Sequence, residues 1–158
     1  KTALAFEKKG ERLYEDAAKK SKNPFVKGVF AYLAGQERNH ITEIAAFMKK
    51  DSPGMKLKGD RKKEVKSFFT TTTTKFQTKL ALTKADLQAY EAGMDLERSS
   101  YAFYKKELEK APDEKAKQFF RFLMEQEAAH YSLIRNAYDY LKDPVNFHRE
   151  EEGWMFEG

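Results

Sequence analysis

The chain has 158 residues, enough for one domain with its own core, and 41% of them are hydrophobic. It contains no cysteine, which excludes disulfides, thiolate metal sites and cysteine nucleophiles within these residues. The net charge of +5 comes from 30 basic and 25 acidic residues, and these are interspersed, as on an ordinary solvated surface, so no nucleic-acid partner is expected.

Four long helical segments are predicted in chain order, at about residues 1–20, 24–50, 84–110 and 113–142. Asn23 can cap the second segment, and Pro24 suits its first helical position. Thr83 and Asp86 form a capping-box pattern at the start of the third. Three- and four-residue steps define the predicted inner faces, which include Met48 on the second segment and Tyr101 on the third.

The connections predict the topology. Short joints make the first and second segments, and the third and fourth, antiparallel hairpins. Residues 51–83 are too many for a plain loop and are expected to form a partly helical crossover. The chain is therefore predicted to be one all-α domain over residues 1–158, a ferritin-like four-helix bundle of two hairpins joined by a long crossover. The tail, residues 143–158, is expected to dock through its aromatic side chains.

The two hairpins are related by a constant shift of 90 residues, as Glu7 and Glu97 illustrate. Matched apolar residues carry little information, because few residue types fill a core. Matched polar residues on core-facing stripes need a reason. The matched polar pairs are Glu7 with Glu97, Tyr14 with Tyr104, Gln36 with Gln126, Glu37 with Glu127, and His40 with His130.

The repeated residues have the chemistry of a two-metal site. Each Glu-x-x-His motif, starting at Glu37 or Glu127, points a carboxylate and an imidazole from one helix face. Two such helices, with one inward Glu from each of the other two, match the six-ligand carboxylate site of helical bundles. Two divalent cations would offset the charge of four buried carboxylates. The predicted metal ligands are Glu7, Glu37, His40, Glu97, Glu127 and His130.

Two tyrosines and the choice of metal complete the predicted site. Tyr14 and Tyr104 lie two turns beyond Glu7 and Glu97, where they would either donate hydrogen bonds to ligand carboxylates or pack as ordinary core. No catalytic residue beyond the ligands is predicted. The donors suit two iron ions, and zinc or manganese would also fit them.

The runs at residues 30–40 and 97–104 resemble the erythrin domain of rubrerythrins, within the ferritin-like superfamily. The resemblance covers nearly the whole chain apart from the crossover. It implies a cytoplasmic di-iron oxidoreductase that reduces hydrogen peroxide, with Glu7 and Glu97 as the carboxylates that bridge or cap the metals.

Two departures from that family matter. A chain without cysteine has no rubredoxin domain, so an external electron-transfer protein, rubredoxin-like in kind, would have to supply electrons. Met94 stands three residues before Glu97, where rubrerythrins carry an extra carboxylate that takes part in a redox-linked ligand exchange. Its absence puts efficient peroxidase action in doubt.

Three functions therefore stay open from the sequence. They are a peroxide-reducing di-iron oxidoreductase, a ferroxidase that oxidises Fe(II) with oxygen and handles the product, and a metal-binding bundle without redox turnover. A homodimer is expected, and the long crossover could exchange between its two chains. No apolar run approaches the ~20 residues of a membrane helix, so no membrane partner is expected.

Overall fold

The computed structural model describes residues 2–49, 61–75, 82–143 and 147. This part of the chain forms five helices: α1 (Thr2–Lys20), α2 (Pro24–Met48), α3 (Arg61–Lys75), α4 (Lys84–Lys110) and α5 (Glu114–Lys142). None of these helices combines the length and the apolar character that crossing a bilayer requires.

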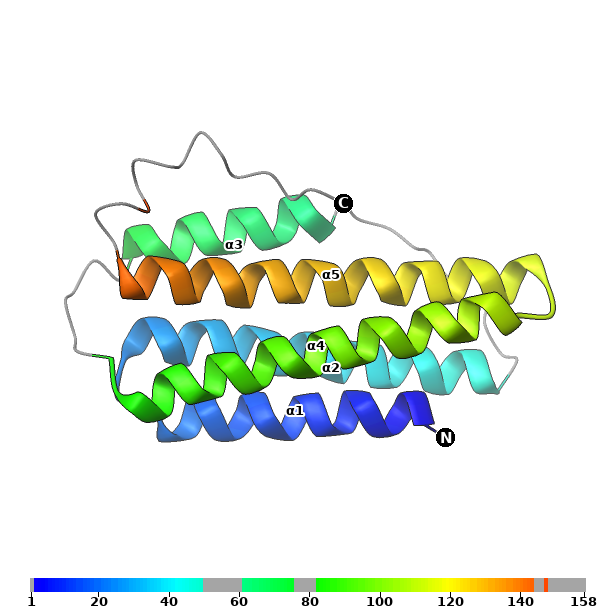
Figure 1. Cartoon of the computed structure of the whole chain (residues 1–158), viewed down its shortest axis with the longest axis horizontal. Coiled ribbons are helices and arrows are strands. Elements are labelled where there is room, and N and C mark those ends of the chain that lie inside the picture. Colours follow the sequence, from blue (N-terminus) through cyan, green and yellow to red (C-terminus); the bar gives the residue numbers. More distant parts are fainter. Residues whose placement is uncertain (1, 50–60, 76–81, 144–146, 148–158) are drawn as a thin grey trace.

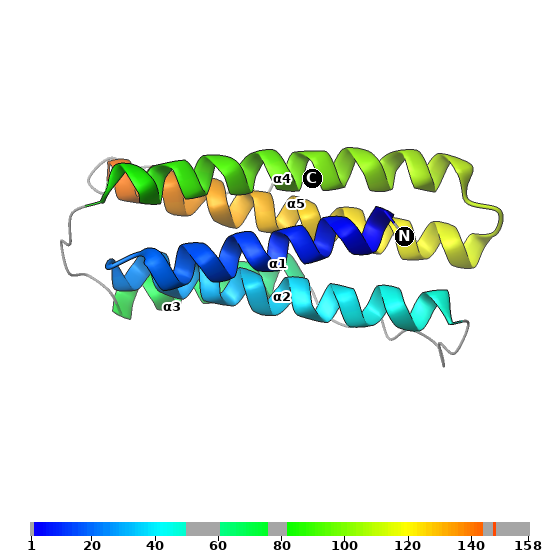
Figure 2. The same ribbon diagram turned by 90° about the horizontal axis from the view of Figure 1, so that it is seen from below.

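Four long helices form the bundle, and each hairpin is one half of it. α1 packs along α2 and α4 packs along α5, while α1 also contacts α4 across the bundle. Both views show the four helices running side by side, with α2 ending at the opposite end of the bundle from the start of α4 (Figures 1 and 2). The prediction of an all-α bundle built from two antiparallel hairpins is confirmed.

The helices begin where the sequence predicts local capping. The Asn23 side chain accepts hydrogen bonds from the backbone N–H groups of Phe25 and Val26, at 2.9 and 3.3 Å. Thr83 and Asp86 form a reciprocal capping box, with both hydrogen bonds at 3.1 Å. These bonds satisfy backbone donors that the first helical turn leaves without a partner.

Part of the predicted crossover, residues 51–83, is helical. α3 lies outside the four-helix bundle and contacts α5 and α2 (Figure 1). Its buried Val65 and Phe69 join the apolar core, where Phe69 meets Phe25 edge to face. Apart from residues 82 and 83, the rest of the crossover lies outside the described residues, as does most of the predicted tail.

The core has two apolar parts with a polar layer between them. The larger part takes in Phe30, Leu133 and Ile134 with the buried side of α3, and the smaller part centres on Ile44 and Leu123.

Two side chains depart from the predicted inner stripes. Met48, the last residue of α2, is 55% exposed, and Tyr101 is 38% exposed. Ser100 and Tyr104 are the buried residues that follow Glu97 on α4, and Tyr101 lies outside this buried face.

Candidate metal centre

Six ionisable side chains gather in the polar layer, each from a predicted position. Glu7 lies on α1, Glu97 on α4, and the two Glu-x-x-His motifs lie on α2 and α5. All six residues are at most 3% exposed: Glu7, Glu37, His40, Glu97, Glu127 and His130. A bundle interior has little water to solvate such charges, so this burial needs a compensating partner.

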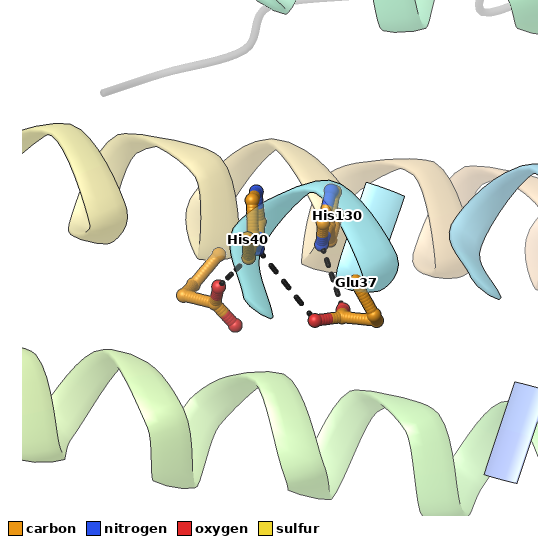
Figure 3. Close-up of side chains that lie close together, drawn as sticks. Glu37, His40 and His130 are labelled. Atoms are coloured by element: carbon orange, nitrogen blue, oxygen red, sulfur yellow. Dashed lines mark ion pairs between the residues drawn. The ribbon is translucent and has the colours of Figure 1, made fainter. Parts of the chain in front are cut away.

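The two histidine rings lie face to face at the middle of the site. Their centroids are 5.1 Å apart and their planes differ by 14°. The Glu37 carboxylate reaches toward both rings: its Oε2 is 3.6 Å from His40 Nδ1 and its Oε1 is 3.2 Å from His130 Nδ1 (Figure 3). Glu37 is therefore placed to bridge two metal positions.

Each histidine also faces the inward glutamate of its own hairpin. His40 Nδ1 lies 3.0 Å from Glu7 Oε2, and His130 Nδ1 lies 3.7 Å from Glu97 Oε1. The 90-residue repeat thus becomes an approximate two-fold arrangement in space. It gives two positions, one beside Glu7 and His40 and the other beside Glu97 and His130.

The two predicted tyrosines cross between the hairpins. Tyr14 on α1 donates a hydrogen bond to Glu97 Oε1 on α4, and Tyr104 on α4 donates one to Glu7 Oε1 on α1. Burial and the neighbouring Glu97 raise the pKa of Tyr14, while burial and the neighbouring Glu7 raise the pKa of Tyr104. Both hydroxyls therefore stay protonated donors that orient a carboxylate, the role the sequence left open.

Without a metal, the pKa values of the ionisable groups at the site shift in different directions. Burial alone would raise the pKa of Glu7, but hydrogen bonds from His40 and Tyr104 help lower it to about 2. Burial would lower the pKa of His40, yet hydrogen bonds with Glu37 and Glu7 raise it to about 9. Burial and the nearby Glu97 carboxylate raise the pKa of both Glu37 and Glu127. Protons thus reduce the repulsion that a cation would otherwise relieve.

Several atoms at the centre lack hydrogen-bond partners. Glu97 Oε2, Glu127 Oε1 and His130 Nδ1 are buried, and the described part of the chain offers none of them a hydrogen bond. A metal would give each a partner, since carboxylate oxygen and neutral imidazole nitrogen are metal donors. Ligand atoms that lie within 4.8 Å of one another come from Glu37, His40, Glu127 and His130. These residues fit a two-metal centre.

Gly10 leaves the space that Glu37 occupies. A Cβ added to Gly10 would lie 3.1 Å from Glu37 Cδ and 3.2 Å from Glu37 Cγ, closer than ordinary van der Waals contact. The matched position on α4 is Ser100, which is buried and carries a Cβ. The backbone of α1 therefore approaches its facing ligand helix in a way that only glycine permits without a shift.

Two residues near the site were missed as functional candidates. Gln126 is 2% exposed, and its Oε1 lies 3.4 Å from His40 Nε2, the ring nitrogen that faces away from the carboxylates. Gly10 was not singled out either. The repeat already contained the Gln36–Gln126 pair, so a polar match on buried faces was the signal for Gln126. No sequence signal separates Gly10 from other helical glycines.

The comparisons with known proteins give one positive result. The family model described as Rubrerythrin matches residues 1–138. Neither the curated proteins nor the solved structures include a significant match. The matched range contains all six buried site residues and both tyrosines.

Proposed function

Because the chain belongs to the rubrerythrin family, we propose that it holds two iron ions between its helices and reduces hydrogen peroxide with electrons from an external donor. The observation that carries this proposal is the buried group of four glutamates and two histidines. Iron bound there would supply electrons and coordination positions to peroxide.

The residues of the chain would hold and orient the ions. Glu7 and His40 would form one end of the centre and Glu97 and His130 the other, with Glu37 and Glu127 between them. Tyr14 and Tyr104 would fix the two end carboxylates through their hydrogen bonds. The surrounding apolar core would keep bulk water from the centre.

The electron donor and the setting are also proposals. These residues contain no cysteine, so electrons would come from outside them, and we propose an external donor of the rubredoxin kind. A homodimer in the cytoplasm remains our expectation.

A ferroxidase is the second candidate, because of Met94. This residue packs partly buried against the apolar core, at the place where the resemblance leads us to expect a carboxylate. A centre without that extra ligand is less suited to redox-linked ligand exchange. Oxidation of Fe(II) by oxygen would not require it.

One experiment separates these candidates. The metal-free protein is loaded with Fe(II) without oxygen, iron is counted per chain, and oxidation rates with peroxide and with oxygen are compared. Two irons and a much faster reaction with peroxide support the peroxidase, whereas preference for oxygen supports the ferroxidase. Two metals that neither oxidant changes would indicate a non-redox bundle. Failure to hold about two metals per chain would contradict all three.

A further inference from the structure

We infer that the two metal positions are unequal, and that the Glu7–His40 position binds a divalent metal at least about tenfold more tightly than the Glu97–His130 position. This inference rests on the proposed two-metal centre. It goes beyond that proposal by assigning Gln126 as a positioning residue for one half of the centre.

The first observation is the set of carboxylates around each histidine. His40 Nδ1 has three carboxylates close by, with Glu7 at 3.0 Å, Glu127 at 3.5 Å and Glu37 at 3.6 Å. His130 Nδ1 has two, Glu37 at 3.2 Å and Glu97 at 3.7 Å. The donor atoms of the His40 position are thus already gathered, whereas those of the His130 position must move further to meet a metal.

The second observation concerns the end glutamates. Glu7 divides its oxygens, because Oε1 accepts the Tyr104 hydrogen bond while Oε2 faces His40. Glu97 uses one oxygen for both contacts: Oε1 accepts from Tyr14 and is also the oxygen nearest His130. Its Oε2 is buried and has no hydrogen bond from the residues that the structure describes. Glu7 therefore divides its two oxygens between the tyrosine and the histidine, whereas Glu97 would have to turn to do the same.

The third observation is the partner of the outer ring nitrogen. His40 Nε2 lies 3.4 Å from Gln126 Oε1, an acceptor that holds a proton on Nε2, so that Nδ1 is the nitrogen left to bind a metal once it gives up its own proton. Within the described part of the chain, the His130 ring has no such hydrogen bond. Gln36, the repeat mate of Gln126, instead lines a surface pocket of about 610 Å³ with residues of α3.

The effect of such a hydrogen bond on metal affinity has a typical size. Loss of a hydrogen-bond partner behind a metal-bound histidine typically lowers metal affinity by about 10- to 100-fold. The His40 position has that partner and the His130 position lacks it, so the first metal should fill the His40 position. The second metal would be the exchangeable one.

The repeat provides matched variants for the test. The metal-free protein is titrated with Co²⁺ alone, followed by its visible absorption and by chelator competition, to obtain two stepwise dissociation constants. We expect two steps that differ at least tenfold. Gln126→Leu should weaken the tight step about 10- to 100-fold, whereas Gln36→Leu should leave both steps unchanged. His130→Gln should keep the tight step, and His40→Gln should lose it.

The failures are distinguishable. Two Co²⁺ ions bound with equal affinity, or equal effects of Gln126→Leu and Gln36→Leu, would overturn the inference and leave the two-metal centre intact. Loss of the tight step in His130→Gln would overturn it as well. Fewer than two ions at saturation would contradict the proposed function itself. Circular dichroism of each metal-free variant checks that the bundle has formed.

Discussion

The hairpin of α1 and α2 and the hairpin of α4 and α5 carry the same inward ligands, yet they differ around them. Gly10 corresponds to Ser100, exposed Met48 corresponds to part-buried Tyr138, and the buried Gln126 corresponds to part-buried Gln36, which lines a surface pocket. The identities agree where side chains from four helices meet at one point. They diverge where the two hairpins have different neighbours, as at Gln36, which lines a pocket beside α3.

The largest effect should come from the glutamates of the two Glu-x-x-His motifs, which the repeat matches to each other. Glu37→Ala and Glu127→Ala each remove a central carboxylate, so metal content should fall from two ions per chain to one or none. Elemental analysis after dialysis against trace metal measures this. If the two hairpins contribute equally to metal binding, both variants should lose metal to the same extent. Full loading of either variant would remove that residue from the ligand set.

Removal of the metal should change both stability and its dependence on pH. A ligand that binds only the folded state at about 100 times its Kd adds about 2.7 kcal/mol, so the metal-free protein should melt at a lower temperature. A melting curve that is indifferent to metal would contradict a buried metal site.

The sign of the pH effect follows from His40. Burial lowers its pKa, but the hydrogen bonds with Glu37 and Glu7 raise it from 6.5 to about 9. Stabilisation from its charged form is complete below pH 6.5 and is lost as the pH rises through 9. The raised pKa of Glu37 and of Glu127 acts in the same direction. The melting temperature of the metal-free protein should therefore fall as the pH rises from 6.5 to about 9. His40→Gln should make the melting temperature depend less on pH over that range.

A smaller effect should distinguish Gly10 from its repeat mate. Gly10→Ala would push the Glu37 side chain, so metal affinity should fall roughly tenfold, which corresponds to about 1.4 kcal/mol. The metal-free protein should not lose stability to the same degree, because alanine favours a helix over glycine by about 1 kcal/mol. Ser100→Ala keeps its Cβ and serves as the control. Equal losses of affinity in both variants would contradict the special role of Gly10.

The smallest effect is expected at Tyr90. Its hydroxyl is buried and has no hydrogen-bond partner among the described residues, so Tyr90→Phe should leave thermal stability unchanged or raise it slightly. Tyr14 is equally buried but donates to Glu97, and Tyr14→Phe should cost about 1.5–3 kcal/mol. Thermal melts of the metal-free variants compare the two. A clear loss in Tyr90→Phe would show that its hydroxyl has a partner after all.

The sequence by itself determined the helices, their pairing and the identity of the central residues. Capping patterns such as those at Asn23 and Thr83 act within one turn, and they appear in the structure as predicted. The Glu-x-x-His motifs were readable because residues three apart share a helix face. The shift of 90 residues then related the two motifs without any tertiary information.

Only the tertiary structure decided how these residues meet. Tyr14 lies on the same helix as Glu7, but it donates its hydrogen bond to Glu97 across the bundle, because α1 packs against α4. The burial of Gln126 and the close approach of Gly10 to Glu37 likewise depend on which helices pack together. A helical period tells which face points inward. It does not tell which side chain of another helix that face will meet, since this depends on helix separation, stagger and rotation.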